Sequence, residues 1–145
     1  MKEYSVYRLV KGEDLNHHGT LFAGRTAEWF VESSFVAASC LVGKPDNIVC
    51  INIHGMQFKS PVKKGEVVHF RSKVAHLGYT SITIYTKVSS ETENINFLPV
   101  EGFITFVHIN EKGEKVPHNL ILDAIKDEDE KKIRDNAIKL FNKNK

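Results

Sequence analysis

One long uninterrupted run constrains this chain more than any other feature. About twenty residues without proline follow a polar loop at 16–19, and Gly43 and Pro45 end the run. Glycine fits the left-handed position just past a helix and proline cannot continue one, so the run predicts a single long helix. Its apolar residues lie on nearly every side of the helical wheel, a pattern typical of a buried helix. Glu28 and Glu32, spaced i,i+4, add acid to one face.

Composition places the chain among ordinary globular proteins. The 145 residues suit one domain, and 41% hydrophobic with 26% charged residues is usual. The formal charge of +2 (20 basic minus 18 acidic residues) does not indicate a nucleic-acid partner. No apolar run predicts a membrane span and no secretory leader is visible, so we expect a cytoplasmic protein. No Cys/His spacing predicts a metal site, and Cys40 and Cys50 are expected to be buried free thiols.

The rest of the chain alternates in the manner of strands separated by turns. A helix with one narrow apolar stripe is expected at the C-terminal end, from about Asp123 within the segment 121–143. The polar, proline-containing segment 91–99 is expected to be a loop. The predicted strands cover 4–10, 46–58, 66–76, 80–90 and 101–110.

Short spacing between successive strands favours antiparallel pairing. Only the long helix is apolar enough to fill a curved sheet, so we expect an α+β fold in which the sheet wraps that helix. The chain is then one domain over 1–145, with a core at about 4–120. The open edges of such a sheet invite a second copy of the chain.

The residues around the helix entrance match a known pattern. Asn16, Gly19, Phe22 and Gly24, followed by Trp29 and an acid, resemble the helix entrance of hotdog-fold acyl-CoA thioesterases of the YciA and cytosolic acyl-CoA hydrolase type. The segments 55–62, 65–68, 78–81 and 103–107 are similar to later motifs of that family in the same order. The resemblance implies a five- to six-stranded antiparallel sheet, dimers with shared active sites that can assemble into trimers of dimers, and acyl-CoA as substrate. It implies no cofactor apart from the coenzyme A that the substrate carries.

One position departs from the family pattern. The family's acid falls seven residues after the second glycine, where this chain has Val31, and Glu32 follows it. The first glycine of the family's pair is replaced by Ala23. Because a one-residue shift turns a side chain by about 100° on a helix, two alternatives to a thioesterase stay open. One is another acyl-CoA enzyme on the same fold, such as a β-aminoacyl-CoA ammonia-lyase, and the other is a non-catalytic acyl-CoA-binding protein.

Thioester hydrolysis needs oxyanion donors and a base, and the helix entrance offers both. Backbone N–H groups near Ala23 and Gly24 would polarise a thioester carbonyl at the positive end of the helix dipole. Glu32 is the expected base, with Glu28 as its substitute, because burial makes a carboxylate more basic. Asn16 would orient the water or the carbonyl, and His17 or the neighbouring His18 would shuttle a proton.

Further residues are predicted to hold the substrate and its coenzyme A. Besides Ala23 they are His54, which could enter the site across a dimer, the cations Lys59 and Arg71, and the hydroxyl residues Thr80 and Ser81. Lysine and arginine suit the phosphates of coenzyme A, and hydroxyls can donate to phosphate or pantetheine. The resemblance places Thr80 and Ser81 on the turn beside the coenzyme. For each of these residues an ordinary surface or packing role is the alternative.

Overall fold

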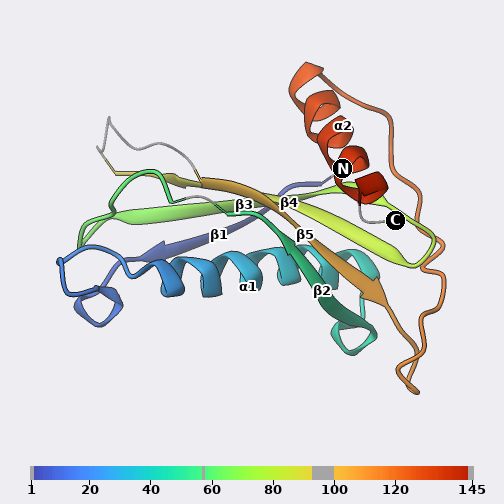
Figure 1. Ribbon diagram of the computed structural model, residues 1–145, viewed down its shortest axis with the longest axis horizontal. Helices are drawn as coiled ribbons and strands as arrows, with labels where there is room; N and C mark the ends of the chain where they lie inside the picture. Colours follow the sequence, from blue (N-terminus) through green and yellow to red (C-terminus); the bar gives the residue numbers. More distant parts are fainter. Residues whose placement is uncertain (1, 57, 93–99, 144–145) are drawn as a thin grey trace.

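Five antiparallel strands form one curved sheet around a long helix in the computed structural model, which describes residues 2–56, 58–92 and 100–143 (Figure 1). The strands pair in the order β1-β3-β4-β5-β2, so β1 and β2 are the two edges. The predicted α+β hotdog architecture is confirmed. Most of the predicted loop at 91–99 lies outside the described residues. The strands are β1 (Tyr4–Leu9), β2 (Ile48–His54), β3 (Val67–Leu77), β4 (Ser81–Ser90) and β5 (Val100–His108).

The predicted central helix is α1 (Ala23–Val42), and it lies against the concave face of the sheet, here called the inner face. Gly43 ends it with a φ of 84° and donates its N–H to Ser39 O at 2.7 Å, as the glycine signal predicts. Phe30 on the helix is fully buried against the sheet. Ser34 Oγ and Thr86 Oγ1 of β4 lie 2.8 Å apart and fix the helix over the middle of the sheet.

The expectation that α1 is buried on all sides is wrong for a single chain. A stripe with i,i+4 spacing stays exposed: Glu28, Glu32, Val36 and Cys40. The sheet curves around the helix without closing beneath it, so no layer formed by the described residues covers this stripe. Cys50 on β2 is exposed as well, and the expected burial of the two thiols is therefore wrong, although both are free cysteines.

The β2 edge of the sheet carries apolar side chains in solvent. Val49, Ile51 and Ile53 are 45%, 54% and 46% exposed. The pairing of β2 with β5 is irregular between Cys50 and Asn52, which is typical of a β-bulge at a sheet edge. An exposed apolar edge strand is a template for pairing with another chain.

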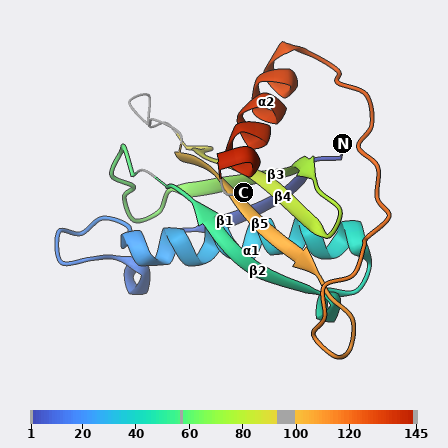
Figure 2. The same cartoon turned by 45° about the vertical axis from the view of Figure 1, so that its right-hand side comes forward.

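The C-terminal helix α2 (Glu128–Lys143) packs on the opposite, outer face of the sheet (Figure 2). It begins at Glu128 and not near Asp123, because Asp127 acts as its N-terminal cap and accepts the N–H of Glu130 at 2.8 Å. The segment before it is pinned by Arg134, which donates to the carbonyl of Asp123 at 2.7 Å. Two short 3₁₀ turns complete the fold, η1 (Gly12–Asp14) and η2 (Pro45–Asn47).

Candidate active site

The first turn of α1 presents backbone donors that the chain itself does not use. Phe22 is the N-cap residue with φ −64° and ψ 128°, and no side chain caps the helix. Its carbonyl accepts the N–H groups of Arg25 and Thr26 at 2.9 and 3.2 Å. Within the described part of the chain, the N–H groups of Ala23 and Gly24 have no acceptor. Two free donors at the positive end of a 20-residue helix make a site for a carbonyl oxygen or an anion.

A pocket of about 280 Å³ lies beside this first turn. Asn16, Ala23, Thr26 and Lys59 line it together with apolar residues from the sheet and from the loop between β2 and β3. Its apolar wall is made by Val62, Val68, Val88 and Val100. A polar entrance with an apolar wall fits a ligand that joins a carbonyl to a hydrocarbon chain. The structure thus brings together three of the predicted site residues, Asn16, Ala23 and Lys59.

Asn16 holds the loop that leads into the helix. Its Oδ1 accepts the N–H groups of His18 and Thr20 at 2.9 and 3.2 Å, and its Nδ2 donates to Thr20 Oγ1 at 3.1 Å. This is the turn role that asparagine favours, and it leaves one Nδ2 hydrogen for a ligand in the pocket. Asn16 therefore has a structural role whether or not it touches substrate.

Two other predicted site residues, His17 and Gly24, make different contacts from those of Asn16. The ring of His17 lies tilted against that of His18, with centroids 3.9 Å apart, and both side chains are exposed. His17 does not line the pocket at the helix start. A Cβ added at Gly24 would come within 2.5 Å of the Phe22 ring, so glycine lets that ring lie against the first turn. This packing role accompanies the open N–H of Gly24.

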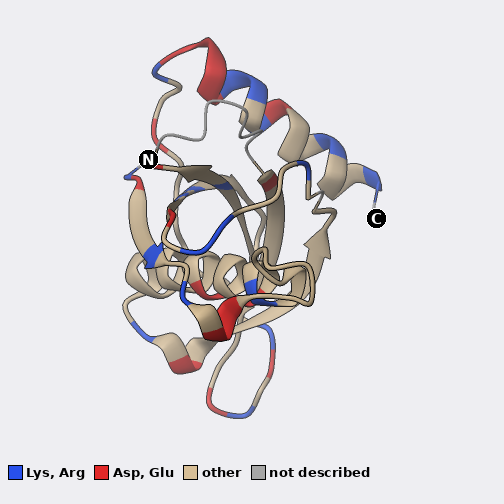
Figure 3. Ribbon diagram, turned by 90° about the vertical axis from the view of Figure 1, so that its left-hand side faces the viewer, with Lys and Arg blue, Asp and Glu red and all other residues tan. Residues whose placement is uncertain are grey.

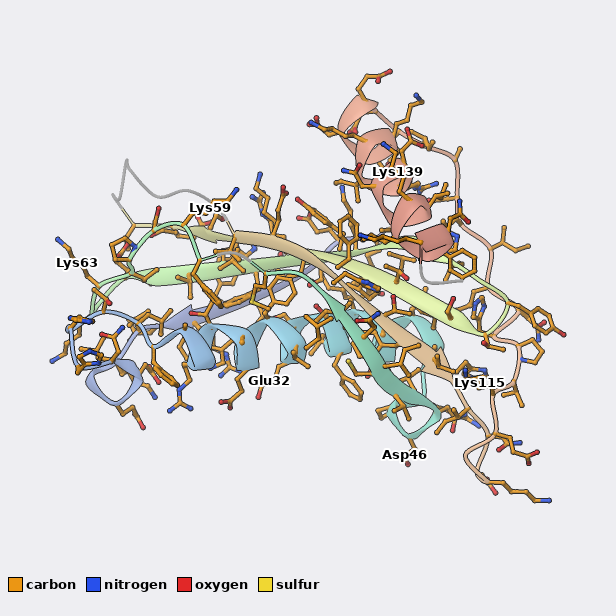
Figure 4. The ribbon with its side chains drawn as sticks, in the orientation of Figure 1. Glu32, Asp46, Lys59, Lys63, Lys115 and Lys139 are labelled. Atoms are coloured by element: carbon orange, nitrogen blue, oxygen red, sulfur yellow. The ribbon has the colours of Figure 1, made fainter. Side chains whose placement is uncertain are left out.

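Glu32 lies on the exposed stripe of α1 (Figure 4). Its Oε2 accepts from Arg8 Nη2 of β1 at 2.7 Å, and the Glu32 side chain is 50% exposed. The expected burial of this carboxylate is therefore wrong for one chain on its own. The Arg8 guanidinium also lies over the Trp29 ring at 5.6 Å, a cation–π contact that fixes its position. Glu28, one turn earlier, instead pairs with Arg25 at 3.6 Å.

A shallow groove of about 480 Å³ runs past Glu32. Val31, Phe35 and Val36 of α1 line it, as do Arg8 and residues from β2 and β5. Val31, at the family's acid position, packs toward the core cluster, whereas Glu32 is turned to the open side. Glu32 is the only carboxylate among the residues that line this groove, and its second oxygen, Oε1, has no partner in the described part of the chain.

The helix start and Glu32 cannot belong to one site within a single chain. Glu32 lies nine positions after Ala23 along α1, a rise of about 14 Å at 1.5 Å per residue. A base must come within hydrogen-bonding distance of the water that attacks the carbonyl. A site that uses both groups therefore needs Glu32 from one chain and the helix start of another.

The remaining predicted residues lie away from the helix start. His54 and Arg71 are on the outer face of the sheet, the side that α2 covers. His54 Nε2 lies 2.8 Å from Thr105 Oγ1, and burial lowers the pKa of this histidine. Ser81 begins β4 beside the end of α2, and the Thr80 carbonyl accepts the N–H of His108 at 2.8 Å. Contact of these residues with coenzyme A stays a prediction.

Two residues near the site were not predicted from the sequence. Asp14 is 4% exposed, accepts the Lys11 N–H at 2.9 Å and lies 3.3 Å from Arg25, so it ties the entrance loop to α1. Its place in a turn of charged residues gave no sign of burial. Arg8 shares the parity of Tyr4 and Val6 in β1, and that inward parity was the available signal that it would reach α1.

Comparison with known proteins agrees with this geometry. Residues 18–96 match the family model described as the thioesterase superfamily. The chain is 26% identical over 106 residues to the uncharacterised acyl-CoA thioester hydrolase YkhA of Bacillus subtilis, covering 72% of this chain and 60% of YkhA. It is 25% identical over 122 residues to acyl-CoA thioester hydrolase YciA of Salmonella typhimurium, covering 79% and 89% of the two chains. A crystal structure of an apo-hexameric acyl-CoA thioesterase superposes with a TM-score of 0.81 at 26% identity, covering 94% and 86%.

The family match covers more than half of the chain, and the protein belongs to the thioesterase superfamily. The resemblance to acyl-CoA thioesterases that the sequence motifs indicate is thereby confirmed. The chain spans about three fifths of the length of YkhA. Neither of the described helices is both long and apolar enough to cross a membrane.

Proposed function

We propose that this protein hydrolyses acyl-CoA thioesters to a free acid and coenzyme A. The observation that carries the proposal is the uncapped start of α1, where the N–H groups of Ala23 and Gly24 are open beside a pocket with an apolar wall. The thioester carbonyl would accept from these two donors. The acyl chain would then lie along the wall formed by the valines of the pocket. Membership of the thioesterase superfamily supports the same reaction.

The proposed reaction places negative charge where the helix can stabilise it. Water adds to the carbonyl carbon, the C=O π electrons move to oxygen, and the open N–H groups and the helix dipole stabilise that oxyanion. The carboxylate of Glu32 takes the proton of the water as the C–O bond forms. Collapse of the tetrahedral intermediate breaks the C–S bond, and the departing thiolate takes the proton back from Glu32. The products are the carboxylic acid and free coenzyme A.

The two halves of this site would come from two copies of the chain. The β2 edge exposes three apolar side chains, and Glu32 lies on a helix stripe that its own sheet leaves uncovered. Antiparallel pairing of two β2 edges would continue the sheet and bring two α1 helices side by side in opposite directions. Each helix start would then face the middle of the other helix. Each dimer would then hold two such sites. Three dimers assembled as a trimer of dimers would match the hexameric state of the structural relative.

Thiol release from a panel of acyl-CoAs, read with a thiol-reactive dye, tests the proposal. Ala23→Pro is a matched probe of the oxyanion donors, because proline is tolerated at the first helical position and removes only the N–H group. Phe22 already has the extended conformation that a following proline requires. We expect wild type to release thiol and Ala23→Pro to lose about 100- to 1,000-fold in kcat. Absence of thiol release by wild type across the panel would contradict the proposal.

The same assay separates the alternatives that the sequence left open. An ammonia-lyase acting on a β-aminoacyl-CoA keeps the thioester intact, so it yields ammonia and no free thiol. A non-catalytic binder yields neither product while still binding acyl-CoA. Hydrolysis alone produces a thiol in step with the free acid.

A further inference from the structure

The ion pair between Arg8 and Glu32 joins the edge strand β1 to the middle of α1. Arg8 shares the inner face of β1 with Tyr4 and Val6, which pack against the core. Arg8 Nη2 donates to Glu32 Oε2 at 2.7 Å, the short end of the range for a charge-assisted hydrogen bond. Among the described residues, Arg8 is the only ion-pair partner of Glu32. The orientation of this carboxylate within the chain therefore depends on one guanidinium.

Buried aromatic rings hold that guanidinium in place. It lies over the ring of Trp29, with its carbon 5.6 Å from the ring centroid, within the range of a cation–π contact. Trp29 is itself buried and meets Phe70 of β3 edge to face, with centroids 6.3 Å apart. Arg8 Nε is buried as well. The sheet thus fixes the arginine, and the arginine fixes the carboxylate of Glu32.

This pair is poorly suited to stabilising the fold. The side chains of Arg8 and Glu32 are 41% and 50% exposed, and an ion pair with that exposure contributes little stability because water screens it. It does restrict a glutamate side chain that would otherwise sample several rotamers. Both residues line the groove, and Glu32 Oε1 has no partner in the described part of the chain. The pair therefore leaves one carboxylate oxygen engaged and the other open in a defined orientation.

We propose that Arg8 is a positioning residue for thioester hydrolysis. The inference rests on the proposed function, in which Glu32 takes the proton of the attacking water. Arg8 holds Glu32 Oε2 so that Oε1 is directed at that water, beside the helix start of the second copy of the chain. Because Arg8 contacts the base and not the substrate, its effect falls on kcat and not on KM. A displacement of a reacting group by about 1 Å can cost about 100-fold in rate.

Thiol release by Arg8→Gln and Arg8→Lys tests this role. Glutamine removes the charge, and we expect it to lower kcat about 10- to 100-fold while KM for acyl-CoA stays within about twofold of wild type. Lysine keeps a charged donor on a long stem that can lie over Trp29, so Arg8→Lys should recover kcat to within about fivefold of wild type. Urea titrations should give both variants a free energy of unfolding close to that of wild type, because the pair is exposed.

A matched control breaks an exposed ion pair elsewhere in the chain. Lys131 and Asp135 pair at 3.8 Å on α2, which lies on the outer face of the sheet, and both side chains are exposed. Figure 3 shows both signs of charge along α2, so the loss of one cation there leaves the helix mixed in charge. Lys131→Gln should keep the kcat and KM of wild type.

Combination with Glu32→Gln separates positioning from a structural role. If Arg8 acts only through Glu32, adding Arg8→Gln to Glu32→Gln leaves the residual rate within about twofold. A structural role would lower the rates of wild type and of Glu32→Gln by the same factor. Refolded mixtures give the same information between chains. Arg8→Gln should regain activity with Ala23→Pro but not with Glu32→Gln, because Arg8 and Glu32 belong to the same half of the site.

Three results would overturn the assignment of Arg8 in a wild type that releases thiol. They are an unchanged kcat in Arg8→Gln, an equal loss in the wild-type and Glu32→Gln backgrounds, and recovery of activity in the mixture with Glu32→Gln. Absence of thiol release by wild type would instead contradict the proposed hydrolysis, and with it the role of Arg8, so the two failures are distinguishable.

Discussion

A charge placed on the β2 edge should dissociate the proposed dimer and, as a consequence, abolish its activity. Ile51 is 54% exposed, and burying a whole isoleucine side chain is worth about 1.5–3 kcal/mol. Burial of the exposed half at a dimer contact therefore contributes about 0.8–1.6 kcal/mol per chain, or about 1.6–3.2 kcal/mol for the two copies. Ile51→Lys removes this term and adds repulsion between two ammonium groups. The dimer should weaken by about 15- to 200-fold or more.

Analytical ultracentrifugation across a concentration series measures this change, and thiol release on the same samples measures activity. Ile121→Lys is the matched control, because Ile121 is 87% exposed in the segment before α2 and lies outside the β2 edge. We expect Ile51→Lys to sediment as a smaller species at low concentration, to lose activity there, and to regain part of it as concentration rises. Ile121→Lys should behave as wild type in both assays.

Full activity in an Ile51→Lys sample that sediments as a monomer would refute the reasoning. It would mean that one chain holds a complete site, against the distance of about 14 Å between the helix start and Glu32. Unchanged assembly of Ile51→Lys would place the interface elsewhere on the molecule.

Further predictions concern stability and the entrance loop. Arg134→Met should lower the free energy of unfolding by about 1.5–3 kcal/mol in urea titrations, because it removes the guanidinium that donates to the 4%-exposed carboxylate of Glu130 at 2.6 Å. Although burial opposes ionisation, hydrogen bonds from the Lys126 N–H and from Arg134 hold the pKa of Glu130 below its usual range. The stabilising contribution of the Glu130 carboxylate is therefore complete above about pH 4.3 and is lost as the pH falls further. The free energy of unfolding should then fall more steeply with decreasing pH in wild type than in Glu130→Gln. Asn16→Ala should cost about 0.5–1.5 kcal/mol of stability and lower kcat, since it removes the acceptor of the His18 and Thr20 N–H groups.

Local signals in the sequence were sufficient for the order and type of the elements, although β2 ends at His54 and not at Phe58 as predicted. Gly43 and the proline-free run predicted α1 to its last residue, and strict alternation predicted β4 to within one residue. The start of α2 was missed by about five residues, because the choice between Asp123 and Asp127 as a cap depends on a contact with Arg134, eleven residues on. Sequence position alone does not reveal that contact.

The site was harder to predict than the fold, for two physical reasons. The wheel of α1 is apolar on nearly all sides, and periodicity does not distinguish burial within one chain from burial between two, so the exposure of Glu32 was missed. The faces of residues on strands depend on register. His54 was predicted to enter the site across a dimer and Arg71 to meet coenzyme A, and pairing with β5 and β4 turns both residues to the outer face. Asn16 and Ala23 line one pocket because they flank one loop and one helix end, and Lys59 reaches the same pocket from the loop between β2 and β3.

Active-site complementation tests the central claim most directly. Glu32→Gln and Ala23→Pro each disable one half of the proposed site, and each variant alone should release thiol at less than about a hundredth of the wild-type rate. After unfolding and refolding an equal mixture, half of the dimers are mixed and each has one intact site, so about a quarter of wild-type activity should return. Activity of the mixture no greater than the average of the two variants would contradict a site shared between chains.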